Sequence, residues 1–249
     1  MAATKSYRDA LAEMSDEARS KFLKNPNRWK IEVGGFLQPP GTDVRISSPF
    51  GEVRTVVVMN DDGTPAFDRP DYREAPATNL VVYGIEDDGT VKIAALSQYR
   101  PHADDPFNQG VDGHKAVLIG QVPQGFLDKM GGGKLETPEE GGLREAGEEA
   151  GAQGFISVER PKIPWQNNNP SHERGWIDVL FIKVDLKRIE ALRHDKKEPI
   201  YAANYVTVKE LFRLIREGRG EDGALFRACN SNSTWMIFFA TYPEFLKQL

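Results

Sequence analysis

The apolar residues near the start of the chain recur every three or four positions. Between residues 6 and 24 they form one stripe, which predicts a single helix that packs by one face. Core packing is the expected use of this stripe, and a dimer contact is the alternative. Pro26 follows the stripe and predicts the end of the helix.

From residue 27 to residue 75 the spacing changes to short apolar runs separated by turn residues. This pattern predicts a small antiparallel β unit. The Asp-Asp-Gly sequence at 61–63 is a hairpin signal within it. Three aromatic residues are expected in the core of this unit or at an interface: Trp29, Phe36 and Phe50. We therefore predict a first domain over residues 1–75.

A polar stretch over residues 68–76 predicts a linker to a second domain, residues 76–249. Strands and helices alternate irregularly in that domain, and a second hairpin signal lies at 87–90. This favours an α/β (α+β) arrangement of layers over a doubly wound sheet. Further strands are predicted over 117–128, 154–159, 176–186 and 201–208, and helices over 208–218 and 224–246.

The stretch from Glu136 to Ala152 predicts one more helix with clear ends. Thr137 and Glu140 have the spacing of a capping box, and Pro138 suits the first helical position. Gly151 is expected to end the helix.

This helix carries more carboxylates than helix stability favours. Glu145 and Glu149 are four residues apart, so their Cβ atoms are about 5–6 Å apart on one face. Two such charges repel by roughly 2–3 kcal/mol at an effective dielectric constant near 20. Glu148 adds to the repulsion, and Arg144 relieves only part of it. A solvated acidic face is one interpretation, and a set of oxygen ligands for a hard cation such as Mg²⁺ is the other.

Composition and charge limit the classes of protein that the chain can belong to. The 249 residues carry a net charge of −5, which does not favour broad nucleic-acid binding. A single cysteine, Cys229, excludes an intramolecular disulfide and suits a reducing compartment. The chain has no apolar run long enough to span a membrane and no apolar leader segment, so we expect a cytoplasmic protein.

The residues from Glu136 to Ala152 resemble the second half of the Nudix box, E-x7-R-E-U-x-E-E-x-G-U, where U is apolar. Every fixed position of that half is matched. The resemblance implies a Nudix-type α/β/α sandwich with a mixed sheet. It also implies Mg²⁺ or Mn²⁺ held by Glu145, Glu149 and Glu148, with Arg144 orienting these glutamates and Glu136 as a supporting residue or a peripheral ligand.

The start of the box departs from the family pattern. The family's opening glycine lies six residues before the first glutamate, where this chain has Met130. Gly125, eleven residues before Glu136, is the best substitute. We interpret the difference as a five-residue insertion in the loop before the helix.

Two further segments resemble the Nudix branch that hydrolyses ADP-ribose and other nucleoside diphosphate sugars. The sequence Ser-Gln-Tyr-Arg-Pro at 97–101 is similar to a strand end of that branch and implies that Arg100 and Gln98 bind substrate. The sequence Gln-Val-Pro-Gln-Gly at 121–125 is similar to its E-L-P-A-G motif. Gln124 would then offer a backbone carbonyl to the metal, and Gln121 would replace an acidic residue and join Arg100 and Gln98 in binding substrate.

The expected activity is metal-dependent hydrolysis of the pyrophosphate bond in a nucleoside diphosphate sugar, with ADP-ribose first in line. The general base is expected at Glu198 or Glu173, or in the box itself at Glu148. Other Nudix substrates, dinucleoside polyphosphates or nucleoside triphosphates, are the alternative, as is a non-catalytic module that senses a nucleotide. We also hypothesise a homodimer formed through residues 1–75.

Overall fold

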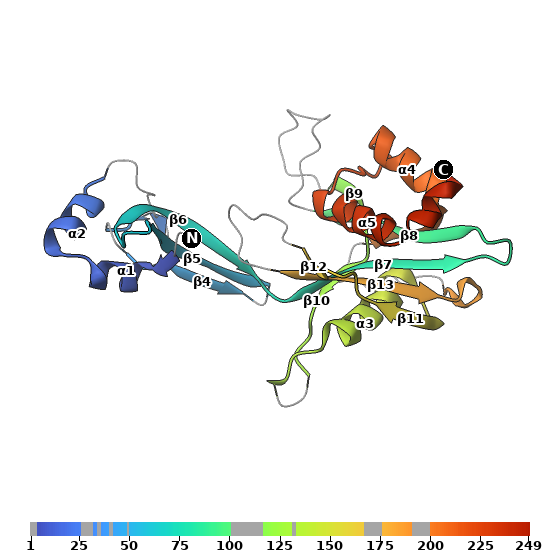
Figure 1. Ribbon diagram of the computed structural model, residues 1–249, viewed down its shortest axis with the longest axis horizontal. Helices are drawn as coiled ribbons and strands as arrows, with labels where there is room; N and C mark the ends of the chain where they lie inside the picture. Colours follow the sequence, from blue (N-terminus) through green and yellow to red (C-terminus); the bar gives the residue numbers. More distant parts are fainter. Residues whose placement is uncertain are drawn as a thin grey trace. The chain divides into compact units, whose positions relative to one another are not determined.

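The computed structural model describes residues 4–25, 32–33, 36–39, 42–48, 50–100, 117–130, 133–166, 176–190 and 200–249. These residues fall into two compact units, which divide between Ala75 and Pro76 (Figure 1). We refer to them as the N-terminal unit and the C-terminal unit.

The N-terminal unit is an antiparallel sheet with two short helices. Its elements are β1 (Thr4–Ser6), α1 (Tyr7–Glu13), α2 (Asp16–Leu23), β2 (Glu32–Val33), β3 (Phe36–Leu37), β4 (Arg45–Ser48), β5 (Gly51–Met59) and β6 (Pro65–Glu74). β5 pairs with β6 along one edge and with β1 and β4 along the other, while β2 and β3 form a separate pair. The core contains Tyr7, Ala10, Met14, Phe22, Val57 and Met59.

The single helix predicted over residues 6–24 is wrong, because the chain breaks between α1 and α2. Met14 adopts an extended conformation, and the hydroxyl of Ser15 accepts a hydrogen bond from the backbone N–H of Ala18. A serine that caps a new helix competes with continuation of the previous one. The apolar stripe still packs as expected, since Tyr7 and Phe22 are both buried.

The polar linker predicted over 68–76 is also wrong, because most of it belongs to β6. This ten-residue strand pairs with β5 along its whole length. Two of its acidic residues, Asp68 and Asp71, are buried beside partners that the sequence pattern does not reveal. Asp68 accepts a hydrogen bond from the hydroxyl of Tyr7, and Asp71 lies near the guanidinium groups of Arg54 and Arg69. Contacts of this kind stabilise polar side chains inside a folded unit.

The aromatic residues of the N-terminal unit give a mixed outcome. Phe36 and Phe50 are exposed, so of the two expected positions the core is wrong for them, while an interface stays a prediction. Trp29 lies outside the described residues. The predicted hairpin turn at 61–63 is confirmed between β5 and β6.

The C-terminal unit contains a large mixed sheet. Its strands are β7 (Ala77–Ile85), β8 (Val91–Arg100), β9 (Val117–Gln121), β10 (Gln124–Phe126), β11 (Phe155–Glu159), β12 (Trp165–Gln166), β13 (Ile177–Val184) and β14 (Ile200–Thr207). The order β11-β13-β7-β8-β14 includes one parallel pair, β13 with β7. β10 pairs with the start of β7 and β9 with the end of β8, so both fill the space where β7 and β8 diverge.

Helices cover both faces of this sheet, as Figure 1 shows. They are α3 (Pro138–Ala150), α4 (Val208–Glu217) and α5 (Cys229–Thr241), with 3₁₀ turns η2 (Leu186–Arg188) and η3 (Pro243–Gln248). Alternate residues of one strand point to opposite faces. Leu80 and Val82 therefore pack with Ala146 of α3, whereas Val81 and Tyr83 pack on the side of α4 and α5. The predicted α/β/α arrangement around a mixed sheet is confirmed.

Local signals predicted several ends of these elements correctly. The 87–90 turn joins β7 to β8. Thr207 caps α4 through the N–H of Glu210, and Gly218 ends that helix in a left-handed conformation. No helix in the described ranges is long and apolar enough to cross a membrane.

Candidate active site

The acidic helix α3 forms as its sequence predicts. The Thr137 hydroxyl accepts a hydrogen bond from the N–H of Glu140, and the Glu140 carboxylate accepts one from the N–H of Thr137. Pro138 is the first helical residue, and Gly151 ends the helix with a φ of 66°. The capping box therefore sets the register in which the acidic side chains project.

Close packing on the sheet explains why α3 contains glycines that weaken a helix. A Cβ on Gly142 would lie 2.6 Å from Cδ1 of Leu180, and one on Gly141 would lie 2.5 Å from Cδ2 of Leu127. The hydroxyl of Tyr205 on β14 also donates to the carbonyl of Ala150 near the helix end. The glycines thus allow α3 to approach β10 and β13 closely.

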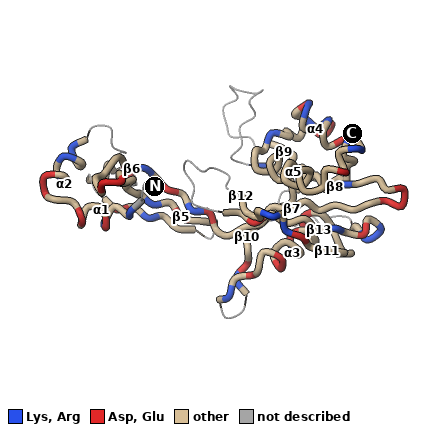
Figure 2. Tube along the Cα trace, viewed as in Figure 1, with Lys and Arg blue, Asp and Glu red and all other residues tan. Residues whose placement is uncertain are grey.

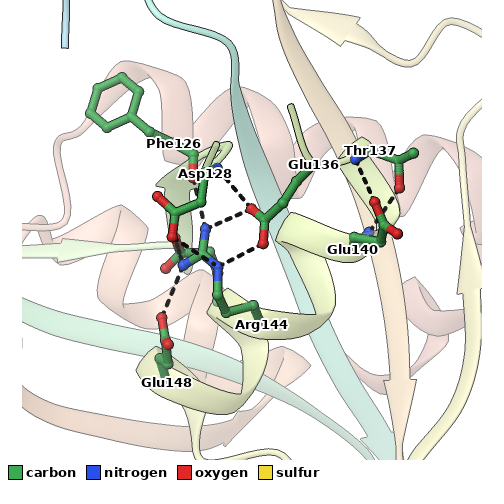
Figure 3. A network of polar contacts seen from close by, with 8 residues as sticks. Phe126, Asp128, Glu136, Thr137, Glu140, Arg144 and Glu148 are labelled. Atoms are coloured by element: carbon green, nitrogen blue, oxygen red, sulfur yellow. Dashed lines mark hydrogen bonds and ion pairs between the residues drawn. The ribbon is translucent and has the colours of Figure 1, made fainter. Parts of the chain in front are cut away.

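The guanidinium of Arg144 lies at the centre of a polar network that Figure 3 shows from close by. Two of its nitrogens donate to the two carboxylate oxygens of Glu136, at 3.1 and 3.0 Å. Nη1 donates to Glu145 at 2.6 Å and to Glu148 at 3.0 Å, and Nη2 donates to the carbonyl of Phe126 at 2.8 Å. One side chain therefore holds three glutamates and the end of β10.

Electrostatics within the network favour the charged forms of Glu136 and Arg144. Hydrogen bonds from Arg144 hold the pKa of the Glu136 carboxyl below its usual range. Hydrogen bonds to Glu136 raise the pKa of Arg144 above its already high ordinary value. Arg144 is therefore a permanent cation, and it lies beside more than one carboxylate.

Glu145 and Glu149 are buried against β10. Glu145 is 4% exposed and Glu149 is 2% exposed. The backbone N–H of Gln124 donates to Oε2 of Glu149 at 2.7 Å, and a Cβ on Gly125 would overlap the carboxylate of Glu145. The glycine at 125 thus leaves the space that the Glu145 carboxylate occupies.

These residues have the donor chemistry that Mg²⁺ or Mn²⁺ requires. Hard divalent cations prefer carboxylate and carbonyl oxygens. One guanidinium contacts three carboxylates, those of Glu136, Glu145 and Glu148, so these four side chains together carry a net negative charge. Figure 2 shows the acidic positions of α3 in red. Within the described ranges, no three Asp, Glu, His or Cys side chains are already arranged around a common metal position. Glu148, whose side chain is 56% exposed, points to Arg144 and would have to turn to join Glu145 and Glu149.

The residues on the two sides of the predicted insertion pair with each other before α3. Lys129 and Leu135 form a β-bridge, and the backbone N–H of Glu136 donates to the carbonyl of Asp128 at 2.9 Å. The N–H of Asp128 donates in turn to Glu136 Oε2 at 2.8 Å. The two ends of the predicted insertion therefore lie side by side. Glu136, which follows it, keeps its contacts with Arg144.

The three residues predicted to bind substrate lie together. Arg100 Nε donates to Gln121 Oε1 at 3.1 Å, and Gln121 Nε2 donates to Gln98 Oε1 at 2.6 Å. Two of the three candidate bases, Glu198 and Glu173, lie outside the described residues, whereas the third, Glu148, lies on α3.

Gln124 contributes more contacts than the sequence indicated. Besides its backbone bond to Glu149, its side-chain oxygen accepts a hydrogen bond from Asn230 Nδ2 at 3.0 Å. Asn230 belongs to the first turn of α5, on the other face of the sheet. The sequence did not predict the contacts of Asn230 or Asp128. Asn230 contacts a residue that is distant in the sequence, and Asp128 contacts Glu136 through its backbone.

No model of a known protein family matches the sequence, and no curated protein matches it significantly. Among solved structures, an ADP compounds hydrolase is 16% identical over 82% of this chain and 92% of its own, with a TM-score of 0.45. The NUDIX domain of NrtR from Shewanella oneidensis, in complex with ADP ribose, is 14% identical over 68% and 87%, with a TM-score of 0.40. A NUDIX hydrolase from Nitrosomonas europaea is 15% identical over 67% and 89%, with a TM-score of 0.38.

Proposed function

We propose that this protein is a Nudix hydrolase that splits a pyrophosphate bond with the help of Mg²⁺ or Mn²⁺. The observation that carries the proposal is the network around Arg144. Its guanidinium holds Glu145 and Glu148 on α3 and Glu136 at the helix entrance, while Gln124 holds Glu149. A helix stabilised for its own sake would not bury two carboxylates four residues apart.

Each polar group has a separate task in this proposal. A bound divalent cation supplies positive charge to the phosphates and lowers the pKa of a coordinated water. Glu145 and Glu149 are its main ligands, with Glu148 and the carbonyl of Gln124 completing the set. Arg144 does not touch substrate and instead orients Glu145 and Glu148 through charge-assisted bonds.

A carboxylate outside this cluster is proposed as the general base. Glu198 is the first candidate, because an apolar strand and a capped helix follow it in the sequence, and Glu173 is the second. Either would position or deprotonate the attacking water. Comparing the rates of Glu198→Gln and Glu173→Gln separates them, and a wild-type rate in both would transfer the role to the box glutamate Glu148.

The proposed substrate is a nucleoside diphosphate sugar, with ADP-ribose as the first compound to test. The products would be a nucleoside monophosphate and a sugar phosphate. The resemblance of residues 97–101 and 121–125 to the ADP-ribose branch supports this choice, and so does the contact between Arg100 and Gln121.

The decisive experiment is a panel of Nudix substrates incubated with Mg²⁺ or Mn²⁺, with detection of nucleoside monophosphate. Release of AMP from ADP-ribose would support the proposal. Cleavage of dinucleoside polyphosphates or nucleoside triphosphates, with nucleotide sugars left intact, would assign another substrate class. Nucleotide binding with no cleavage of any compound would favour the sensing module. The presence of Glu145, Glu148 and Glu149 together argues against that last reading.

A homodimer formed through residues 1–75 also remains a proposal. Its basis is the position of this unit before the C-terminal unit, as in the dimeric relatives that the sequence resembles. Light scattering at micromolar protein concentration tests it, and a monomer mass would contradict it.

A further inference from the structure

A buried glutamine, Gln121, holds the guanidinium of Arg100, and a second, Gln98, holds Gln121. Gln121 accepts the hydrogen bond from Arg100 Nε, and its own amide nitrogen donates to Gln98 Oε1. Gln98 is 5% exposed and Gln121 is 3% exposed. Side-chain amides at this depth are costly unless their polar atoms are hydrogen-bonded. Each of these amides therefore has its orientation fixed by its neighbour, and Arg100 is fixed in turn.

This group lies on the same face of the sheet as the acidic cluster of α3. A Cβ on Gly120 would meet the ring of Phe226, and Val122 packs with the same cluster, on the side of α4 and α5. Gln121, between them in the chain, points to the α3 side. Gly125 faces Glu145 on that side, and four residues of extended chain span at most about 14 Å. The residues that contact Arg100 and Glu145, which are Gln121 and Gly125, therefore lie close together on one face of the sheet.

The chemical identity of the acceptor decides what Arg100 can do. A carboxylate at position 121 would form a charge-assisted bond with the guanidinium and cancel its charge locally. The amide of Gln121 fixes the same nitrogen without contributing any negative charge.

We infer that Gln121 is a positioning residue, and that it holds Arg100 in place without adding a negative charge beside the guanidinium, so that Arg100 binds a phosphate group of the substrate. Gln98 supports Gln121 from behind. The inference rests on the proposed function and refines it, because it assigns the phosphate contact to Arg100 alone. The two glutamines then act on the ligand only through Arg100.

The test uses ADP as the ligand and Gln121→Glu as the main variant. Isothermal titration in EDTA measures ADP binding without metal, and steady-state kinetics with Mg²⁺ measure the effect on hydrolysis. Loss of one charged contact is expected to raise the Kd for ADP about tenfold, with a similar rise in KM and little change in kcat. Gln121→Met, which removes the hydrogen bond without adding a charge, is expected to give a smaller rise.

A double-mutant cycle with Arg100→Met distinguishes positioning from direct contact. If Gln121 acts through Arg100, adding Gln121→Met to Arg100→Met will not weaken ADP binding further. Additive losses would mean that Gln121 touches the ligand itself, and this would overturn the inference. The cycle also decides the matter if Gln121→Glu does not fold, as judged from circular dichroism.

The metal-free binding measurement separates this inference from the proposed reaction. One outcome is that no substrate of the panel is cleaved, while the Kd for ADP rises in the Gln121 variants as expected. The proposed hydrolysis would then be wrong, and the role of Gln121 would stand. If the wild-type protein hydrolyses ADP-ribose while Gln121→Glu keeps the same Kd and KM, the role of Gln121 is wrong. A wild-type protein that binds no ADP in EDTA would overturn it as well.

Discussion

The carboxylate of Glu145 lies against the α-carbon of Gly125, in the space that a Cβ would occupy. This contact joins the centre of α3 to β10, and Arg144 Nη1 holds the same carboxylate at 2.6 Å. The proposed metal ligand is therefore fixed from two sides, by the shape of the backbone and by a charge-assisted hydrogen bond.

Gly125→Ala is expected to reduce turnover much more than stability. The new methyl group overlaps the end of a flexible side chain, which can rotate away at a cost of about 1–3 kcal/mol. The rotation moves the Glu145 carboxylate from its position, and a displacement of about 1 Å near a reacting centre costs about 100-fold in rate. Thermal melting and kcat, measured on the same preparation, test this, and Gly147→Ala on the same helix is the matched control. An unchanged kcat in Gly125→Ala would show that the position of Glu145 does not matter.

Glu149→Gln is expected to lower turnover by orders of magnitude and to leave the melting temperature unchanged or raised. Glutamine keeps an oxygen that can accept the hydrogen bond from Gln124, while it removes a buried charge four residues from Glu145. The measurements are kcat with saturating Mg²⁺ and a melting curve without metal. Turnover at the wild-type level would exclude Glu149 as a metal ligand.

Arg144→Lys is expected to destabilise the protein although it preserves the charge. An ammonium group cannot reproduce the fork that contacts Glu136 with two nitrogens and Glu145 with a third. Losing these bonds is expected to cost about 2–3 kcal/mol, which lowers the melting temperature by roughly 5–10 °C. The matched control is Arg213→Lys.

That control removes a similar set of bonds from a more exposed place. Arg213 contacts Glu210 and Glu217 on the surface of α4, where ion pairs contribute little. A melting temperature that falls equally in both variants would mean that the Arg144 network adds nothing beyond an ordinary surface ion pair.

Asp178→Asn is expected to keep or raise the melting temperature at pH 7, although Asp178 forms an ion pair with Arg160 at 3.2 Å. Burial raises the pKa of the Asp178 carboxyl above its ordinary value of 3.8, and this outweighs Arg160. A raised carboxyl pKa means that the folded state disfavours the ionised form. This penalty is absent below pH 3.8 and grows as the pH rises through the folded-state pKa.

Melting curves from pH 7 down to pH 4 test this sign. The advantage of the asparagine variant is expected to shrink as the pH falls, because Asp178 itself becomes protonated. A variant that melts several degrees below wild type at pH 7 would show that the pair with Arg160 outweighs the burial of the carboxylate.

Local signals explain which parts of this fold were predictable. The ends of α3 and α4 follow from short-range capping by Thr137 and Thr207, and these agree with the sequence. β6 was missed because Asp68 is stabilised by Tyr7, 61 positions away in the chain. From the sequence alone, a polar residue is predicted to be solvent-exposed. Its hydrogen-bonding partner becomes known only from the folded structure.

In the candidate site too, short-range contacts could be predicted from the sequence and long-range contacts could not. Arg144, Glu145, Glu148 and Glu149 share one helix, so their spacing alone brings them together. The contact of Gln121 with Gln98 and Arg100 depends on the pairing of β8 with β9. Motif spacing could name these three residues as a group but could not show that their amides bind one another.

Asn230 provides the last prediction, because it connects the two helical layers through the sheet. Its Nδ2 donates to the side chain of Gln124, whose backbone N–H donates to Glu149 on the opposite face. Asn230→Ala removes this tie and is expected to weaken metal binding about tenfold, the lower end of the range for residues that orient metal ligands. Asn230→Asp is the matched control, since the amide of Gln124 can rotate and donate to the new carboxylate. Electron paramagnetic resonance of bound Mn²⁺, without substrate, measures the affinity directly. Equal Mn²⁺ affinity in wild type and Asn230→Ala would show that Gln124 holds Glu149 without help from α5.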